Sequence, residues 1–481
     1  MLLRSFVYLR YEQLAFDSDQ AITGLMAKHL IEGRAIPLFF YGQTYMLAVE
    51  AWVAAPFVLL FGPTVTALRI SLFVWNVAFA WMVLLVLQGD NRLSLWLALV
   101  SASFFLLAPA SIAPQLMWAQ GAIVEPYAYV AGLWLLRKRP LWFGALLAIG
   151  FRNREFVAYA VPALIIVELC SGEMTRARGR DWFVAAVIFA GVWQMVEALK
   201  PFADLMGPGT RGQATAFAGT QLENLVDRFD FGYRVLPERA ATLGPQMLKW
   251  FSGAGQVDSA LPLPDRWWLA AAGGAFLVIA SGRLLFLIFR PAASVDSRSR
   301  TWGRVVAERV RSANFALYLA IIGKLAIVFF IAGKPVVAGY SRYALLGILL
   351  PLGLTASLLA LEPVDMIRRG TTVLILGWAL LSARDHWSVA AAFARAPESN
   401  SARIVADRLV DDGVRIARAG YWRAYVITFY SRERVHVASE ELPRIQLYQD
   451  EVLETHEPVV RISDSACPDG QRIGELYLCR P

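Results

Sequence analysis

Apolar stretches separated by short charged segments fill the first 383 residues of this chain. About 20 helical residues cross the hydrocarbon layer of a membrane, which is roughly 30 Å thick. Stretches that reach or approach this length predict about ten membrane spans. They lie at residues 64–88, 93–108, 121–136, 140–150, 156–170, 182–199, 267–290, 313–332, 342–361 and 367–383. The pattern therefore predicts a mainly α-helical, polytopic transmembrane bundle.

Two segments before the first predicted span follow a different pattern. Residues 20–33 carry apolar side chains at helical spacing with Lys28 and Glu32 on the other side, which predicts a helix lying on the membrane surface. Residues 44–61 are apolar, but Glu50 and a proline interrupt them. We expect this second segment to stay on the outer membrane surface.

The composition changes sharply toward the C-terminus. Residues 421–430 and 434–438 are rich in aromatic and β-branched residues and are separated by polar turns, which predicts strands. We therefore expect two parts, a transmembrane module at residues 1–383 and a small α/β domain outside the membrane at residues 384–481.

Composition and charge agree with a membrane protein. Hydrophobic residues make up 57 % of the chain and charged residues only 17 %, whereas a soluble domain is about a quarter charged. A net charge of +8 would suggest nucleic acid as a partner in a soluble protein. Because the arginines cluster in short loops, membrane topology explains them better. We expect a lipid bilayer as the partner and no nucleic acid.

Four basic clusters predict the orientation. They are Arg137-Lys138-Arg139, the arginines from 176 to 180, those from 290 to 311, and Arg368-Arg369. Short cytoplasmic loops are enriched in lysine and arginine, and all four clusters are cytoplasmic if residues 64–88 cross first. The same solution puts the acidic loop 16–63, the long loop 200–265 and the C-terminal domain outside the cytoplasm. If residues 44–61 crossed instead, the acids of this loop would lie inside.

The cysteines and one histidine indicate structural roles. Cys467 and Cys479 lie in the tail without a histidine at ligand spacing, so we expect no metal site there. In an extracytoplasmic tail the two would form a disulfide. Cys170 ends an apolar stretch, where we expect a small core residue. His29 has apolar and aromatic neighbours, so we expect it to be packed or interfacial.

Two acids open the segment at residues 20–33. Acids at a membrane edge are costly to place, so a functional site is the first interpretation. Asp17 is followed three residues later by Gln20, a pairing that predicts a capping box at the helix start. Asp19 lies in the first turn, where an acid suits the helix dipole but is not needed as a cap. Asp19 is therefore the first catalytic candidate and Asp17 the second.

The residues around these acids resemble a known family. Phe16-Asp17-Ser18-Asp19-Gln20-Ala21, an aromatic loop at 37–45, Leu60-Phe61-Gly62-Pro63 and Ala67-Leu68-Arg69 are similar to the first extracytoplasmic loop of GT-C glycosyltransferases. The branch is the one that holds protein O-mannosyltransferases and lipid A aminoarabinose transferases. The resemblance covers roughly the first 170 residues. That family has a full transmembrane helix before its acidic loop, whereas residues 1–16 are too short and too charged to span.

The resemblance implies a multi-pass enzyme of the inner (plasma) membrane with an extracytoplasmic active site. Such an enzyme moves a sugar, with inversion, from a polyprenyl-phosphate donor to a hydroxyl of a glycan, lipid or protein acceptor. We expect no cofactor, because the donor is itself a lipid-linked sugar phosphate. Asp19 is implied as the general base, and Gln20 stands where a second acid is usual. Arg342-Tyr343 and Glu125 are similar to an Arg-Tyr pair and an acid of related enzymes.

Further candidates for substrate binding have structural alternatives. Arg152 and Arg154 stand on the predicted outer side, where cations could stabilise a leaving phosphate, but a turn with an internal Arg–Glu pair is equally expected. Lys334 could bind phosphate or extend its ammonium to the interface. Glu50 and Glu125 lie in apolar runs, where they could contact sugar hydroxyls or simply face a polar crevice.

Two other functional classes stay open. A catalytically silent GT-C-like subunit of a membrane complex would explain Gln20 in place of an acid. A lipid or solute transporter would also carry membrane acids. Transporters commonly show repeated halves with paired broken helices, and no internal repeat is evident in this sequence.

Overall fold

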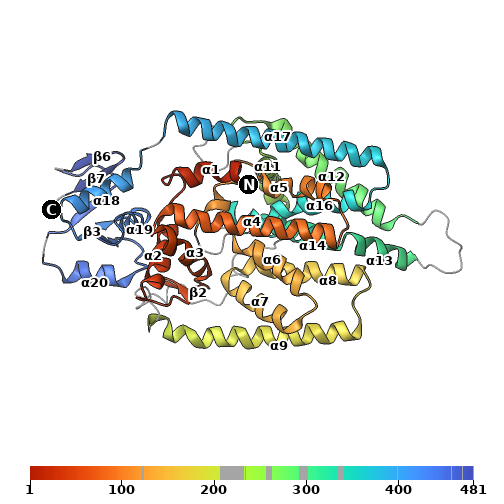
Figure 1. Cartoon of the computed structure of the whole chain (residues 1–481), viewed down its shortest axis with the longest axis horizontal. Coiled ribbons are helices and arrows are strands. Elements are labelled where there is room, and N and C mark those ends of the chain that lie inside the picture. Colours follow the sequence, from red (N-terminus) through yellow and green to blue (C-terminus); the bar gives the residue numbers. More distant parts are fainter. Residues whose placement is uncertain are drawn as a thin grey trace.

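The computed structural model of this chain describes residues 1–120, 124–205, 232, 234–255, 263–291, 302–333, 341–397, 399–456, 458–468 and 470–479. The described part is elongated, with long helices running along its axis and a small α/β domain at one end (Figure 1). The prediction of a mainly α-helical bundle with a small C-terminal α/β domain is confirmed.

The bundle contains helices of very different length. They are α4 (Val65–Gly89), α5 (Leu95–Leu106), α6 (Glu125–Leu136), α7 (Pro140–Asn153), α8 (Ala160–Cys170), α9 (Arg176–Leu199), α11 (Val235–Ser252), α12 (Trp267–Phe289), α13 (Trp302–Ser312), α14 (Asn314–Ile331), α16 (Leu349–Leu361) and α17 (Asp365–Arg395). Short 3₁₀ turns are η1 (Gln115–Met117), η2 (Glu155–Tyr159), η3 (Lys200–Leu205) and η4 (Ser341–Ile348).

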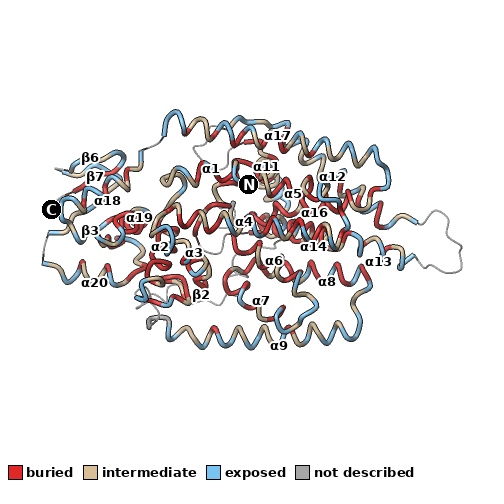
Figure 2. The backbone as a smooth tube through the Cα atoms, viewed as in Figure 1, coloured by how far each residue is buried: buried red, intermediate tan, exposed pale blue. Residues whose placement is uncertain are grey.

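Five stretches of the described chain are long and apolar enough to cross a membrane: Val65–Gly89, Arg176–Phe202, Trp267–Phe289, Asn314–Ile331 and Arg342–Leu361. The other predicted spans coincide with the shorter helices α5 to α8 and with α17. In an apolar 18-residue window of the stretch containing α16, 83 % of the residues are buried, whereas the corresponding share for the stretch containing α9 is 11 %. Accordingly, α14 and α16 run through the middle of the bundle and α9 and α17 cover its sides (Figure 2).

The basic clusters gather at the bundle end farthest from the α/β domain. Arg137 pairs with Asp90 at the end of α4, with 3.2 Å between Nη2 and Oδ2. Arg311 donates to the Ser171 carbonyl just before α9, and Arg309 donates to the carbonyl of Arg290 after α12. Arg368 lies in the first turns of α17, and α17 begins at this same end (Figure 1). The structure therefore places described members of all four clusters together, as their sequence positions predict.

The N-terminal segment packs on the opposite end of the bundle, and its helix α2 (Ser18–Ile31) contacts the α/β domain. The segment comprises α1 (Leu2–Arg10), α2, β1 (Phe39–Phe40), β2 (Gln43–Leu47) and α3 (Val49–Phe61). The prediction that α2 lies on the membrane surface is wrong: Ile22, Leu25 and even His29 are fully buried, because α2 packs between α3 and the C-terminal domain. Its polar residues face partners far along the chain, which the local pattern could not reveal.

A buried arginine fixes the approach to α2. Arg69 of α4 is 1 % exposed and donates to the carbonyls of Tyr8, Tyr11 and Leu14. Buried polar groups must find hydrogen-bond partners, so this one guanidinium satisfies three carbonyls of the chain between α1 and α2. It thereby sets the position at which Asp17 begins the helix.

The C-terminal domain is a five-stranded sheet with three helices. Its elements are α18 (Ser401–Asp411), β3 (Ile416–Ala419), α19 (Tyr421–Tyr430), β4 (His436–Ser439), α20 (Gln446–Glu454), β5 (Val460–Ser463), β6 (Gln471–Ile473) and β7 (Leu476–Cys479). The strand order is β4-β3-β5-β7-β6. Strand β3 is parallel to β4 and β5, whereas β7 is antiparallel to β5 and β6.

Two local predictions in the tail need correction. The segment 421–430 is the helix α19 and not a strand, because it is buried against both α2 and the sheet and the burial does not alternate. The predicted strand at 434–438 is found as β4. The predicted domain start at residue 384 falls inside α17, which continues to Arg395.

The structure confirms the prediction for two of the cysteines and contradicts the one for the third. Cys467 and Cys479 form the expected disulfide, with their Cα atoms 6.0 Å apart. Cys170 is exposed at the end of α8, so the prediction of a core residue is wrong. Cys170 lies with Leu169 on the exposed side of α8, whereas Glu168 and Ser171 are buried.

Candidate functional site

Asp17 caps α2, and its carboxylate also meets a tryptophan. Oδ1 accepts from the Gln20 backbone N–H at 3.1 Å, and Oδ2 accepts from the Trp118 indole N–H at 3.1 Å. The predicted capping role is confirmed, but the reciprocal half of the capping box is not formed. The Gln20 side chain instead donates to the Ala15 carbonyl at 2.6 Å and accepts from the Ala119 N–H at 3.1 Å. It therefore braces the 118–120 segment against α2.

The environment of Asp17 changes its protonation. Burial of the carboxylate and the negative charge of Asp19 raise the pKa of Asp17 to about 7, against hydrogen bonds from Gln20 and Trp118 that lower it. A carboxyl group with a pKa near neutrality can exchange a proton under ordinary conditions, and such groups are common at functional sites.

Asp19 is held by two neutral side chains. The Gln120 amide N–H₂ donates to Oδ2, and the Tyr421 hydroxyl donates to Oδ1. Within the part of the chain that the structure describes, no lysine or arginine forms a salt bridge with this carboxylate. Among the described residues, the hydrogen-bond donors found at this carboxylate are the neutral groups of Gln120 and Tyr421.

Gln120 joins this acid to a cation. Its carbonyl Oε1 accepts from Arg342 Nη1 at 2.9 Å, while its N–H₂ group faces Asp19. The opposite amide orientation would set N–H₂ against a guanidinium and C=O against a carboxylate, so the network itself fixes the assignment. The amide thus holds a carboxylate and a guanidinium side by side.

A second guanidinium shares an aromatic ring with the first. The Cζ atoms of Arg154 and Arg342 each lie 5.2 Å from the ring centroid of Tyr343, a cation–π distance. The Phe156 ring meets the same Tyr343 ring edge-on at 5.5 Å. Four predicted site residues, Asp19, Arg154, Arg342 and Tyr343, are therefore linked in one group.

Arg152 has its contacts in another direction. Its guanidinium pairs with Glu197 of α9 and lies 4.0 Å from the Trp193 ring centroid. Glu197 also pairs with Lys200 at 2.8 Å. These contacts anchor α7 to α9, so they give Arg152 a role in the packing of the bundle.

Three further candidates for substrate binding are Glu50, Glu125 and Lys334. Glu50 lies in the first turn of α3, which packs on α2, and Glu125 opens α6; both are buried. Lys334 lies outside the described residues. No group of three or more His, Cys, Asp or Glu side chains in the described ranges is arranged to hold a metal ion.

Sequence reasoning missed the contribution of the C-terminal domain. Tyr421 is 402 residues away from Asp19 in the chain, and no local pattern marks it as a partner. Arg444 supports this tyrosine, with its Cζ atom 5.8 Å from the ring centroid and its Nη1 donating to the Gly42 carbonyl at 3.1 Å. The one available signal was the aromatic character of the segment 421–430, which we assigned to a strand.

An apolar cavity opens between the helices of the bundle. Its volume is about 470 Å³, and it lies between α5, α11, α12, α14, α16 and α17. Its walls include Phe104, Leu248, Phe251, Phe276, Leu350 and Trp378. None of the candidate acids or arginines lines it, so it is suited to hydrocarbon and not to charged groups.

Known proteins offer limited comparison. No protein-family model and no curated protein matches this chain. The solved structures that are similar include ArnT from Cupriavidus metallidurans in the apo state, with 10 % sequence identity and a TM-score of 0.44. ArnT from the same organism bound to undecaprenyl phosphate has 11 % identity and a TM-score of 0.43. Both alignments cover 99 % of this chain and 96 % of the other. At these TM-scores the similarity decides nothing about function, which has to be argued from this chain's own residues.

Proposed function

We propose that this chain is an integral membrane glycosyltransferase of GT-C type. It moves a sugar from a polyprenyl-phosphate donor to an acceptor hydroxyl outside the cytoplasm, with Asp19 as the general base. The observation that supports this most strongly is the link from Asp19 through Gln120 to Arg342. Transfer of a sugar from a phosphate needs a carboxylate for the hydroxyl and a cation for the phosphate, close together.

The proposed step is a single displacement. The acceptor oxygen attacks the anomeric carbon, and a new C–O bond forms while the bond from that carbon to the phosphate oxygen breaks. The bonding electron pair leaves with the phosphate, and the acceptor proton passes to the Asp19 carboxylate. A carboxylate within hydrogen-bond reach of a hydroxyl acts as a general base in this way. Attack opposite the leaving group inverts the anomeric configuration.

The cations serve the leaving group in this proposal. Guanidinium groups bind phosphate oxygens through charge-assisted hydrogen bonds and stabilise the charge that develops on them. Arg342 and Arg154 are the proposed phosphate contacts, and Tyr343 keeps their guanidinium groups near one another. Lys334 is a further proposed phosphate contact, and Glu50 and Glu125 are proposed contacts for sugar hydroxyls. Arg152 supports the site indirectly through α9.

The apolar cavity suits the lipid part of the donor. A polyprenyl chain is a hydrocarbon, and its burial among apolar side chains is favourable. The cavity walls combine aromatic and aliphatic groups from helices that are apolar enough to span a membrane. The chain would enter sideways from the bilayer, with its phosphate at the end of the bundle that carries Arg342.

The orientation is also a proposal. The basic clusters at one end favour the cytoplasmic side, so the acids and the C-terminal domain at the other end are assigned to the outside. The Cys467–Cys479 disulfide agrees with this, because such bonds persist in oxidising compartments. The division into a membrane module and an extracytoplasmic domain follows from the same assignment.

The test is transfer by the purified protein in lipid nanodiscs. Polyprenyl-phosphate sugars are supplied with glycan, lipid and peptide acceptors, and the anomeric configuration of any product is determined by NMR. We expect a product of inverted configuration from at least one donor. Retained configuration would remove the single-displacement mechanism, and absence of transfer with every donor would favour a silent subunit.

A further inference from the structure

Helix α19 of the C-terminal domain lies in close contact with α2 (Figure 1). Ser18 Oγ donates to the Tyr421 carbonyl at 2.5 Å, near the first turns of both helices. Farther along, a Cβ atom on Gly24 would lie 2.4 Å from the Phe429 ring. Because only glycine fits there, the contact between the two helices is tight along their length.

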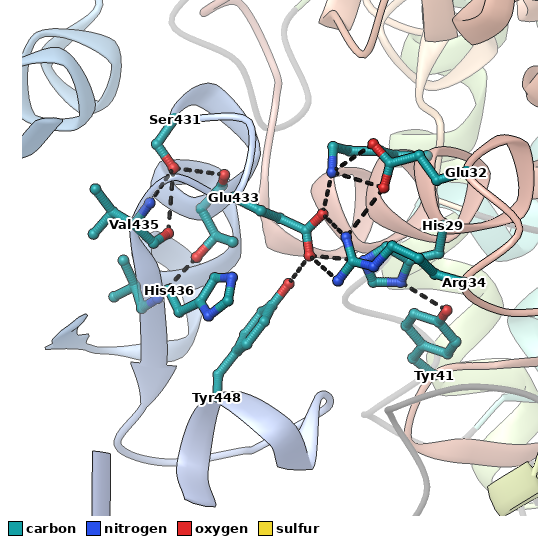
Figure 3. Close-up of polar contacts among 12 residues, drawn as sticks. His29, Glu32, Arg34, Tyr41, Ser431, Glu433, Val435, His436 and Tyr448 are labelled. Carbon is teal, nitrogen blue, oxygen red and sulfur yellow. Dashed lines mark hydrogen bonds and ion pairs between the residues drawn. The ribbon is translucent and has the colours of Figure 1, made fainter. Parts of the chain in front are cut away.

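The far end of α2 meets an ion cluster centred on Glu433 (Figure 3). The Glu433 carboxylate accepts from Lys28 Nζ at 2.5 Å, His29 Nε2 at 2.7 Å, Arg34 Nη1 at 2.8 Å and the Tyr448 hydroxyl at 2.7 Å. The Glu433 side chain is only 3 % exposed. We call these five residues the Glu433 cluster. It joins α2 and the turn after it to the C-terminal domain.

The backbone that carries Glu433 is in an uncommon conformation. Arg432 and Glu433 follow α19 with φ angles of 56° and 60°. Two successive non-glycine residues in the left-handed region cost free energy and persist only where surrounding contacts fix them. Here the turn directs Glu433 back toward α2.

The charges of the cluster favour a permanently ionised acid. Burial alone would raise the pKa of Glu433, but hydrogen bonds and charge from His29, and then from Lys28 and Arg34, hold that pKa well below its usual range. Tyr41 contacts the other ring nitrogen of His29 at 2.9 Å, which leaves Nε2 to donate to Glu433. The Glu433 carboxylate therefore stays ionised near neutral pH, and its own titration does not weaken the contact between the C-terminal domain and α2 there.

The two contact points together fix α19 in register with α2. Tyr421 meets Asp19 at the start of α2, and Glu433 meets Lys28 and His29 at its end. Two attachments along parallel helices prevent sliding and rotation of one helix on the other. The position of the Tyr421 hydroxyl on the carboxylate is then set by the Glu433 cluster.

We propose that the C-terminal domain completes the acidic site, with Tyr421 as a positioning residue for Asp19 and the Glu433 cluster as the attachment that holds Tyr421 there. This inference rests on the proposed function. The Tyr421 hydroxyl orients one carboxylate oxygen and leaves the other for Gln120 and the incoming acceptor. A domain more than 380 residues downstream of Asp19 thereby controls the geometry of the proposed base.

The test compares two variants with matched controls in the nanodisc protein. Tyr421→Phe removes the hydroxyl, and its control Tyr477→Phe changes a tyrosine of β7 in the same domain. Glu433→Gln removes the central charge, and its control Glu440→Gln breaks the exposed pair with Arg461. Transfer rates are measured against donor concentration, and hydrogen exchange is followed in residues 18–31.

We expect Tyr421→Phe to lower kcat about tenfold with little change in KM, as loss of one positioning hydrogen bond to a charged group would. Glu433→Gln should give a similar loss of kcat and faster exchange in α2. Both controls should match the unmodified protein.

Four outcomes contradict the inference in different ways. A Tyr421→Phe protein with unchanged kcat removes the positioning role, and so does one in which KM changes and kcat does not. If Glu433→Gln speeds hydrogen exchange in residues 18–31 but leaves kcat unchanged, the Glu433 cluster holds the domain on α2 without positioning Tyr421. If the unmodified protein transfers nothing, the proposed function fails and the positioning role with it. Hydrogen exchange then still decides whether Glu433 holds the domain on α2, and unchanged exchange overturns that part.

Discussion

The basic clusters at one end of the helical bundle and the Asp19 group at the other differ in how their charges are paired. At the end with the basic clusters, several arginines form direct ion pairs: Arg178 pairs with Glu168 at 2.5 Å and Arg283 pairs with Glu362 at 2.7 Å. At the other end, the neutral amide of Gln120 stands between Asp19 and Arg342. Direct ion pairs hold helices together, whereas a carboxylate and a guanidinium set side by side offer two separate groups to a substrate. The comparison therefore distinguishes the basic clusters from the Asp19 group, and the Glu433 cluster near Asp19 belongs with the ion-paired structural contacts.

The largest contrast between the ends is their expected side of the membrane. Cys170 at the basic end is exposed and is the one free thiol of the chain, since the other two cysteines form a disulfide. Asp411→Cys adds an exposed thiol to the C-terminal domain. In intact cells an impermeant maleimide should label the thiol at position 411 only, and both should react after permeabilisation. Labelling of Cys170 alone in intact cells would reverse the orientation.

Two similar acids sharpen the chemical side of the comparison. Asp19→Asn keeps the shape of the side chain but removes the base, and we expect kcat to fall about 10²–10⁴-fold. Asp90, at the basic end, accepts from the Trp134 indole at 2.9 Å and pairs with Arg137, so Asp90→Asn is the matched control. Its transfer rate should stay within a few-fold of the unmodified protein. Equal losses in the two variants, measured with thermal unfolding as a check on folding, would make Asp19 a structural residue.

A pair of arginines gives the next contrast. Arg342→Gln removes a proposed phosphate contact, and loss of one such stabilising donor typically costs about 10²-fold in kcat. Arg137 likewise lies over an aromatic ring, 4.0 Å from the Trp134 ring centroid, but at the basic end. Arg137→Gln should therefore leave transfer nearly unchanged. If both variants transferred at the normal rate, the phosphate would bind elsewhere.

The smallest expected effect concerns Asp17 and pH. Burial, with the charge of Asp19, raises the pKa of Asp17 to about 7. Below that pH Asp17 is neutral, and above it Asp17 is an anion that strengthens the neighbouring base. Transfer should therefore rise a few-fold between pH 6 and pH 8, as expected for one nearby charge. Asp17→Asn should keep the helix cap and flatten this rise; an unchanged profile would show that Asp17 does not titrate there.

The sequence predicted the architecture because the relevant signals are local. Apolar runs and clustered arginines are recognised within a window of about 20 residues. The runs coincide with helices of the structure, although only five described stretches are long and apolar enough to span a membrane. The cap formed by Asp17 and the Cys467–Cys479 bridge were also predicted, since each depends on short spacing.

The site was only partly predictable because it joins distant segments. Gln120 and Tyr421 are 101 and 402 residues from Asp19, and neither belongs to a recognisable motif. The same distance explains why α2 was predicted as a surface helix and residues 421–430 as a strand. Each of these helices is buried against the other, so its local sequence pattern does not reveal its partner. Glu433 was missed for this reason as well, although it ties Lys28 and His29 to the C-terminal domain.

The most direct test of the central claim is a structure determined with a bound polyprenyl phosphate. We predict phosphate oxygens within hydrogen-bond distance of the Arg342 and Arg154 guanidinium groups, about 3 Å, and the apolar chain in the cavity lined by Phe251 and Trp378. Asp19 would then face the position of the transferred sugar. A phosphate bound at the end with the basic clusters, or a chain outside this cavity, would contradict the account.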